Sequence, residues 1–229
     1  TEASILSEPN MTLALAYYKT TKRIGNIECH LIKRIGESDS NTNLTEYPSG
    51  TAIRNAYYNK EDITSFIPYN IDKLSNVDET NNNLSLLLKL LSTKSKDNFK
   101  DLVNIKEGIE NYILSNIDLQ MNFEENIQNL CNKSYTKSRI RRTILSMMLE
   151  IPTSIVNEVI PIRVLGFNKK GATYLKNIKH NDLITNIKQS NNKYLKYDLD
   201  ACKLYSIITN QDLIMDEYKF PIKKGLENE

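Results

Sequence analysis

The sequence has few cysteines and no long apolar run. Its three cysteines, Cys29, Cys131 and Cys202, lie far apart and never form a CxxC pair. This spacing argues against a disulfide framework or a zinc site, and it fits a reducing cytoplasm. The apolar run at residues 84–91 is far shorter than the roughly 20 residues that a membrane-spanning helix needs. We therefore expect a soluble, cytoplasmic protein without membrane contact.

The net charge is small and histidines are few, and both facts argue against certain functions. The formal net charge is only +2, which argues against a strongly basic chain that coats nucleic acid, so any RNA contact must be a local patch. The two histidines, His30 and His180, are too far apart in sequence to suggest a metal pair, and we expect no metal site. The sequence has no Gly-rich phosphate loop and no nucleophile supported by a base.

The length and composition suit one large or two modest globular domains. The chain has 229 residues, of which 40% are hydrophobic and 25% charged. Residues 76–83, rich in Asn, Asp, Glu and Thr, are predicted to be a linker, and we place a domain boundary near residue 75. Before it, the periodicity predicts a helix at 11–22, a partly buried strand at 27–35, a polar loop at 36–47 and a helix at 52–58.

The second part, residues 76–229, is predicted to be mainly helical with short strands. Apolar residues recur at helical spacing at 84–91, 99–117, 123–131 and 138–149, with Gly108 inside the second of these segments. We expect a strand at 160–167, a basic helix at 169–179, a short strand at 183–187, a last helix at 197–209, and a loosely held tail from residue 216. The predicted fold class is α/β, followed by a mainly helical domain with a small α/β end.

The sharpest sign of chemistry is the helix start at Ser49, Gly50 and Thr51. The N-terminus of a helix offers unpaired backbone N–H groups and a positive dipole end, which together favour a phosphate. Gly50 leaves room for a phosphate oxygen, Ser49 and Thr51 add hydroxyl donors, and Arg54 can reach forward with a charge-assisted hydrogen bond. The alternative is an ordinary helix cap followed by an exposed arginine.

Asn10 and Arg34 form a second candidate pair. Asn10 stands in a turn at the entry of a helix, where it is either a cap or a nucleotide contact. Arg34 closes the predicted strand, and ligands of open α/β sheets bind beyond the carboxyl ends of strands. A solvated surface arginine is the alternative for Arg34.

A basic segment at residues 133–142 is the third candidate. It combines five basic residues with a tyrosine and contains no acidic residue, which suits a phosphate backbone and a stacked base. The predicted RNA-binding residues are Lys133, Tyr135, Lys137, Arg139, Arg141 and Arg142. The alternative is a solvated helix start whose long side chains cover apolar surface. A second basic run at 169–179 could widen the patch or be an exposed helix face.

Taken in order, these segments resemble the bacterial tRNA(Met) cytidine acetate ligase family. The matching stretches cover nearly the whole chain: Pro9-Asn10 with residues 13–19, Ile32-Lys33-Arg34, residues 48–54, Ile67-Pro68, residues 107–111, residues 133–142 and residues 162–167. The Ser-Gly-Thr-x-Ile-Arg element alone is shared with other nucleotidyltransferases, whereas the ordered set is much more specific.

The resemblance implies a Rossmann-like nucleotidyltransferase and a two-step reaction. Acetate and ATP, with Mg²⁺, would give acetyl-adenylate, and the acetyl group would pass to the wobble cytidine of elongator tRNA(Met). Residues 1–75 would form the C-terminal part of the nucleotide-binding domain, with ATP held by Asn10, Arg34, Ser49, Gly50, Thr51 and Arg54. Residues 76–229 would hold tRNA.

Two departures from the family pattern limit this expectation. The opening strand and the HxGH-type motif of the family do not occur in this sequence, so we expect the chain to be a fragment that is inactive alone. Where members carry a His-Asp pair after Arg34, residues 36–39 read Gly-Glu-Ser-Asp. A different adenylylating enzyme, supported by residues 49–54 alone, and a non-catalytic RNA-binding module remain alternatives.

Overall fold

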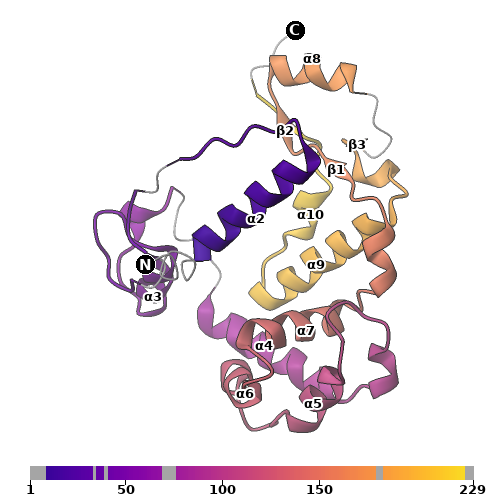
Figure 1. Ribbon diagram of the computed structural model, residues 1–229. Coiled ribbons are helices and arrows are strands. Elements are labelled where there is room, and N and C mark those ends of the chain that lie inside the picture. Colours follow the sequence, from indigo (N-terminus) through magenta and orange to yellow (C-terminus); the bar gives the residue numbers. More distant parts are fainter. Residues whose placement is uncertain (1–8, 33–34, 39–40, 69–75, 179–182, 225–229) are drawn as a thin grey trace. The chain divides into compact units, whose positions relative to one another are not determined.

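The computed structural model describes residues 9–32, 35–38, 41–68, 76–178 and 183–224 (Figure 1). The chain divides into two compact units, unit 1 at Thr1–Ile71 and unit 2 at Asp72–Glu229. The predicted boundary near residue 75 falls in the range 69–75, outside the described residues.

Unit 1 contains two helices and a short 3₁₀ turn. These are α2 at Pro9–Ile24, α3 at Gly50–Tyr58 and η1 at Thr64–Phe66. The buried apolar residues described here include two alanines on one face of α3, Ala52 and Ala56, which are 0% and 4% exposed, and the larger Ile63, which is 1% exposed. Because two alanines form that face, the backbone of α3 can approach its surroundings closely.

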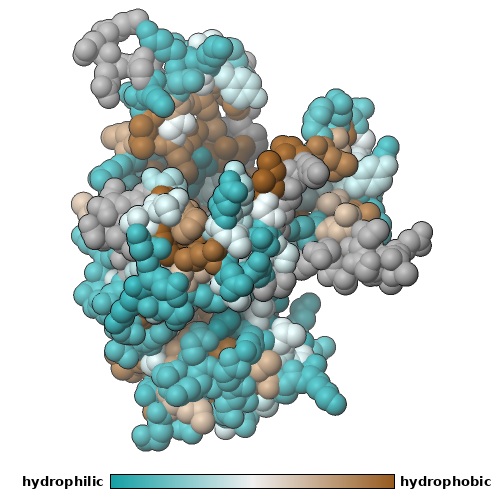
Figure 2. All heavy atoms as spheres, turned by 90° about the vertical axis from the view of Figure 1, so that its left-hand side faces the viewer, coloured by the Kyte–Doolittle hydropathy of each residue, from teal (hydrophilic) through white to brown (hydrophobic). Residues whose placement is uncertain are grey.

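The apolar face of α2 is not buried by the described residues. The periodicity correctly predicts a helix, but Leu13, Tyr17 and Tyr18 are each half exposed or more. Apolar surface is also visible as brown areas on the face shown in Figure 2. A helical pattern thus predicted the local structure of α2 but not its burial.

The strand predicted at 27–35 is absent from the described residues of that segment. Residues 27–32 and 35 belong to no helix or strand, and Leu31 and Ile32 are 92% and 93% exposed. A strand exists only when a neighbour accepts its backbone hydrogen bonds. No such neighbour lies among the described residues of unit 1, so the alternating pattern remains unpaired.

Unit 2 opens with helix α4 at Val77–Ser92, so the linker predicted at 76–83 is wrong. Asn76 caps the helix: its side-chain oxygen accepts hydrogen bonds from the backbone N–H groups of Asp78 and Glu79, at 3.0 and 3.1 Å. The two acidic residues then lie in the first turn, where the helix dipole favours negative charge. The polar composition that suggested a linker is the composition of a helix start.

The single helix predicted at 99–117 is also wrong, because a loop occupies its first half. The 3₁₀ turn η3 covers Lys96–Phe99, and α5 begins only at Ile109 and ends at Asn116. Between them, Asp101, Asn104, Glu107 and Gly108 all have positive φ. These left-handed residues stop a right-handed helix, and Gly108 is the N-cap of α5.

The core of unit 2 is formed by α4, α5, α6 and α7. Helix α6 spans Phe123–Leu130 and α7 spans Lys137–Leu149, in agreement with the predicted helices at 123–131 and 138–149. The four helices gather at one end of the unit (Figure 1). The core cluster consists of Leu88, Leu91, Phe99, Leu102, Ile109, Ile113, Phe123, Ile127, Leu130, Ile140, Ile144 and Met147.

The α/β end of unit 2 is built on two very small parallel sheets. After the 3₁₀ turn η4 at Thr153–Asn157, the predicted strand at 160–167 is split into β1 at Ile162–Arg163 and β2 at Gly166–Phe167. Strand β1 pairs with β3 at Leu183–Ile184, and β2 pairs with β4 at Ile222–Lys223. The basic helix is α8 at Lys169–Asn177. The tail was predicted to be loosely held from residue 216, but the pairing of β4 with β2 fixes part of it.

Helix α9 at Lys193–Thr209 joins the α/β end to the helical core. It follows the 3₁₀ turn η5 at Ile187–Gln189 and precedes α10 at Ile214–Glu217. Its C-terminus is held by α4, because Asn83 Nδ2 donates to the carbonyl oxygens of Ile207 and Ile208 at 3.3 and 3.1 Å. Asn210 Nδ2 donates to Glu79 Oε1 at 2.7 Å. Asn83 of α4 thus satisfies two carbonyl groups at the end of α9, and Glu79 of α4 accepts from the side chain of its C-cap residue, Asn210.

One buried amide closes the turn between α5 and α6. Asn126 is 1% exposed, and its side-chain oxygen accepts a hydrogen bond from the Asp118 N–H at 2.8 Å. Its side-chain nitrogen donates to the carbonyl oxygens of Asp118 and Asn122, at 2.9 and 3.1 Å. A buried polar side chain is tolerated because its hydrogen bonds are made.

We predict that Asn126→Leu lowers the free energy of unfolding of the protein by about 3 kcal/mol, because the backbone groups of the turn would lose their partners in a buried site. Urea denaturation followed by circular dichroism measures the change. The matched control is Asn129→Leu on the exposed side of the same helix, which should change the stability by less than about 0.5 kcal/mol. Equal losses in both variants would contradict the role of the buried amide.

Candidate functional site

The start of α3 is capped by a serine whose hydroxyl group is fully used inside the protein. Ser49 Oγ accepts a hydrogen bond from the Ala52 N–H at 3.0 Å and donates to the Asn41 carbonyl oxygen at 2.6 Å. The residue is only 2% exposed. The structure therefore gives Ser49 the role of a cap that anchors the loop to the helix, and its single proton is not free for a phosphate.

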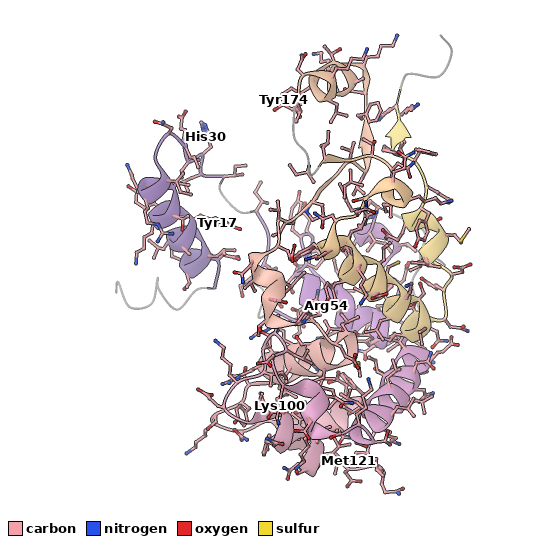
Figure 3. All side chains as sticks on the ribbon, turned by 90° about the vertical axis from the view of Figure 1, so that its right-hand side faces the viewer. Tyr17, His30, Arg54, Lys100, Met121 and Tyr174 are labelled. Atoms are coloured by element: carbon pink, nitrogen blue, oxygen red, sulfur yellow. The ribbon has the colours of Figure 1, made fainter. Side chains whose placement is uncertain are left out.

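The guanidinium group of Arg54 folds back over this helix start. Arg54 Nη2 donates to Thr51 Oγ1 at 3.2 Å, and a Cβ atom built on Gly50 would lie 3.3 Å from Arg54 Nη1. The side chain is exposed and is labelled in Figure 3. In the described part of the chain it has no carboxylate partner. An uncompensated positive charge therefore lies beside the positive end of a helix.

Two backbone N–H groups at the same place have no acceptor within the described residues. Ala52 N–H bonds to the Ser49 side chain and Ile53 N–H bonds to the Ser49 carbonyl oxygen, whereas Gly50 and Thr51 N–H have no such partner. Gly50 is exposed and carries no side chain to block access. The helix start thus combines two free donors, the dipole end and a guanidinium group, which is a suitable arrangement for an anion.

Among the described residues, no polar contact joins Asn10 to this helix start. Asn10 is exposed and lies inside α2, which begins at Pro9, so it is not the residue before the helix. In the described part of unit 1, no hydrogen bond links Asn10 to α3. Arg34 lies outside the described residues. The proposed ATP contacts of both residues remain predictions.

The basic segment at 133–142 forms a tight turn followed by the first turns of α7. Asn132 Oδ1 accepts hydrogen bonds from the N–H groups of Ser134 and Tyr135, at 2.8 and 2.9 Å. Thr136 then caps α7 by accepting from the Arg139 N–H at 3.3 Å. The turn and the cap hold the basic residues on a well-defined backbone.

Two arginines of this segment are paired with glutamates that are distant in sequence. Arg139 Nη2 lies 3.0 Å from Glu107 Oε2, and Arg141 Nη2 lies 2.5 Å from Glu124 Oε2. The absence of acidic residues within the segment therefore did not mean an absence of neutralising charge. No local signal could have revealed these pairs, because the partners are separated by 32 and 17 positions.

Tyr135 belongs to a stack of side chains and is only partly exposed. Its ring centroid lies 5.2 Å from that of Tyr112, and the guanidinium carbon of Arg139 lies 5.0 Å from the Tyr135 ring centroid. Tyr135 also packs against the hydrophobic core of unit 2. These contacts occupy part of the ring surface that a stacked base would need, and they hold Arg139 in place.

Three basic residues of the segment have no acidic partner among the described residues. These are Lys133, Lys137 and Arg142, of which Lys133 and Arg142 are exposed. The first turn of α7 contains no acidic residue, so its dipole end adds to the positive charge. The segment thus keeps a net positive surface even with its two ion pairs formed.

The sequence did not single out Arg163, whose two ion pairs are the most buried among the described residues of unit 2 and join β1 to α9 and α10. Arg163 contacts Asp198 at 2.8 Å and Glu217 at 2.6 Å, and its side chain is 21% exposed. Burial lowers the pKa of Arg163, but the hydrogen bonds to both carboxylates outweigh this and raise it. Burial, with the charge of Glu217, raises the pKa of the nearby Cys202 thiol. This arrangement is structural, and the thiol stays protonated at neutral pH.

Histidine and metal chemistry find no support in the described residues. His30 is exposed beside Glu28 at 3.7 Å, and His180 lies outside the described part of the chain. The described residues contain no group of three His, Cys, Asp or Glu side chains that could hold a metal ion. None of their helices is both long enough and apolar enough to cross a membrane.

A helix start suited to an anion in one unit and a basic helix start in the other agree with the similarity of the sequence to known proteins. Residues 1–218 match the family described as HIGH Nucleotidyl Transferase. Because the match covers almost the whole chain, the protein belongs to the HIGH nucleotidyl transferase family.

Within this family, the sequence is similar to tRNA(Met) cytidine acetate ligases, which confirms the resemblance carried by the ordered segments. It is 30% identical to the tRNA(Met) cytidine acetate ligases of Staphylococcus aureus strains JH9 and COL over 217 residues. These alignments cover 90% of this chain and 57% of each relative. The chain thus spans little more than half the length of the curated relatives it matches.

Two solved structures share the fold. TmcAL of Thermotoga maritima in its apo form is matched with a TM-score of 0.70 at 23% identity, over 95% of this chain and 61% of that chain. The same protein bound with alpha-thio ATP is matched with a TM-score of 0.70 at 22% identity, over 95% and 60%. These matches confirm the predicted fold class, a nucleotidyltransferase-like portion followed by a mainly helical domain with a small α/β end.

Proposed function

We propose that this protein is part of an ATP-dependent ligase that activates acetate as acetyl-adenylate and acetylates the wobble cytidine of elongator tRNA(Met). The observation that carries the proposal is the start of α3, where Gly50, the free N–H groups and the Arg54 guanidinium form a cradle that a Cβ atom would crowd. The names of the relatives, tRNA(Met) cytidine acetate ligase, supply the substrates of the proposal. The enzyme would act in the cytoplasm.

The proposed reaction has two balanced steps. First, a carboxylate oxygen of acetate attacks the α-phosphorus of ATP, and the bond to the leaving pyrophosphate breaks. Second, the exocyclic amine of cytidine attacks the acyl carbon of acetyl-adenylate, AMP leaves, and the amine loses a proton. The first step depends mainly on positioning and on neutralising phosphate charge, which a helix start and a guanidinium group can provide.

The residues proposed to bind ATP contribute in different ways. Gly50 and Thr51 would donate backbone N–H groups to a phosphate, and Arg54 would pair with its charge. Ser49 would act by fixing the helix start, because its hydroxyl is already bonded on both sides. Asn10 and Arg34 are further proposed ATP contacts. No residue is assigned as a catalytic acid, base or nucleophile.

ATP is bound by most enzymes together with Mg²⁺, which is commonly held by the phosphates and only one or two carboxylates. The described residues offer no cluster of acidic side chains for this ion. We propose that Mg²⁺ enters with ATP and is held mainly by its phosphate oxygens. The solved structure of Thermotoga maritima TmcAL bound with alpha-thio ATP supports ATP as the nucleotide.

Unit 2 is proposed to hold the tRNA through the basic segment at 133–142. The two ion pairs of that segment do not prevent this role, because exposed ion pairs contribute only about 0–1 kcal/mol and can be exchanged for a phosphate. Lys133, Lys137 and Arg142 need no such exchange. Tyr135 would act chiefly by holding Arg139, although one part of its ring remains accessible.

The proposed activity is tested in the cells from which the protein comes. The coding sequence is disrupted, elongator tRNA(Met) is purified, and the wobble nucleoside is analysed by mass spectrometry. We expect N4-acetylcytidine to disappear and to return when the gene is restored. Unchanged acetylcytidine would overturn the proposal. Loss of a different adenylate-dependent modification would instead favour another adenylylating enzyme, and RNA binding without any lost modification would favour a non-catalytic RNA-binding module.

We predict that Arg54→Ala weakens ATP binding about tenfold or more, because a hydrogen bond to a charged group contributes about 1.5–3 kcal/mol. Isothermal titration of the purified protein with ATP measures the dissociation constant. Arg23→Ala is the matched control, since Arg23 is an exposed arginine at the end of α2 in the same unit. Equal ATP affinities of the wild type and Arg54→Ala would show that Arg54 does not contribute to ATP binding.

Gly50→Ala separates binding from stability at the same position. The new Cβ atom would lie 3.3 Å from Arg54 Nη1 and would push the guanidinium group aside. Alanine is also a better helix residue than glycine. We therefore predict weaker ATP binding without a lower melting temperature, both measured on the purified protein. An unchanged ATP affinity would show that the close approach of Arg54 to Gly50 is not needed.

We predict that Arg142→Ala weakens tRNA binding and lowers the dependence of log Kd on log salt by about 0.7–0.9. Filter binding at several salt concentrations measures both quantities. Arg141→Ala should have a smaller effect on the slope, because Glu124 already neutralises part of its charge. Arg23→Ala in unit 1 serves again as the control. If the slopes of all variants equal that of the wild type, the basic segment is only a solvated helix start.

A further inference from the structure

Unit 2 has a second basic surface, formed by residues that come later in the sequence than the segment at 133–142. An open groove of about 450 Å³ lies between η5, the first turns of α9 and the end of α10. Its lining residues are mostly polar and include four lysines: Ile187, Lys188, Ser190, Asn191, Asn192, Lys193, Leu195, Lys196, Leu199, Asp200, Lys203 and Tyr218. We name this surface the lysine groove.

Two of these lysines have no carboxylate partner among the described residues. Lys188 and Lys196 are both exposed, and neither takes part in an ion pair there. Lys188 Nζ lies 5.9 Å from the ring centroid of Tyr218, and Lys196 Nζ lies 5.4 Å from that of Tyr197. The aromatic rings support the long side chains but do not neutralise their charge.

The other two lysines are paired only at the surface. Lys193 Nζ contacts Glu158 Oε1 at 3.2 Å, and Lys203 Nζ contacts Asp200 Oδ1 at 2.9 Å. The hydrogen bond to Asp200 raises the pKa of Lys203, which therefore stays protonated at neutral pH. Exposed pairs of this kind are weak and can open when a stronger anion approaches.

The remaining features of the groove also favour an anion. Asp200 is the only acidic residue in its lining. Asn192 caps the 17-residue helix α9 by accepting from the Tyr194 N–H, and the first turn of that helix contains no acidic residue. The positive dipole end of α9 thus lies at the groove. One face of Tyr218 is covered by Lys188, so the groove offers charge more than a stacking platform.

We propose that the lysine groove is a second contact surface for RNA and binds its sugar-phosphate backbone. The identity of this RNA as the tRNA substrate rests on the proposed function. Four lysines along an open groove can contact successive phosphates without reading bases, so the groove would position the RNA and would tolerate any sequence. It extends the RNA surface well beyond the predicted residues at 133–142.

The test compares tRNA binding by the wild-type protein and by the double variant Lys188→Glu/Lys196→Glu. Both side chains are exposed, so the fold should be preserved, and circular dichroism checks this. We expect roughly tenfold weaker binding at about 0.15 M salt and a salt slope smaller by about 1.5, because two phosphate contacts are lost. Lys19→Glu/Lys22→Glu on α2 has the same change in net charge and should bind like the wild type.

Four outcomes would overturn the proposal. In the first, the groove variant binds tRNA like the wild type. In the second, both double variants lose affinity equally, and in the third, the wild type does not bind tRNA at all. In the fourth, the groove variant loses only its binding to vesicles containing phosphatidylserine, which would assign the groove to a membrane surface. Failure of the proposed function is recognised separately: acetylcytidine would persist after gene disruption while the lysine groove still governed RNA affinity.

Discussion

The burial of one face of α7 determines where the basic residues of unit 2 can lie. Ile140, Ile144 and Met147 are at most 2% exposed, and the polar Thr143 and Ser146 are buried between them. With this face fixed in the core, the helix cannot rotate, so its charged positions must lie on the opposite side or at its edges. A polar side chain on the buried face also needs partners, and this need fixes the neighbouring loop.

That loop, residues 100–108, makes the contacts that α7 requires. Asn104 Nδ2 donates to Ser146 Oγ at 2.9 Å, and the Val103 N–H donates to the Ile151 carbonyl oxygen at 2.8 Å. The loop then delivers Glu107 to Arg139. Glu107 therefore neutralises part of the positive charge at the start of α7. Its loop is held in position by the hydrogen bonds of Val103 and Asn104.

Local features of the fold were predictable from the sequence, and contacts between distant segments were not. The helices at 123–131 and 138–149 have clear apolar periodicity and caps, and both occur as predicted. The prediction of a linker at 76–83 was wrong because Asn, Asp and Glu occur often both in linkers and at helix starts. Only the packing of α4 distinguishes the two. The prediction of a strand at 27–35 was wrong for the described residues, because alternation of apolar and polar residues does not guarantee a neighbouring strand to pair with.

The candidate sites follow the same division. The helix start at Ser49 was predictable from residue type, but the hydrogen bond from its hydroxyl to Asn41 depends on how the preceding loop folds back. The basic cluster at 133–142 was visible in the sequence, whereas its pairing with Glu107 and Glu124 required the tertiary structure. The lysine groove was missed because its lysines are spread over two elements, η5 and α9, and are interrupted by Asp198 and Asp200.

The contact between α4 and α9 has a consequence for how unit 2 folds. The hydrogen bond between Glu79 and Asn210 joins residues 131 positions apart, and α4 is the first helix of the unit. During synthesis on the ribosome, α4 therefore exists long before the helix whose C-terminus it caps. Closing so long a loop slows folding, and until then the polar side of α4 must remain hydrated. The asparagines of α4 keep this surface compatible with water until α9 packs against it.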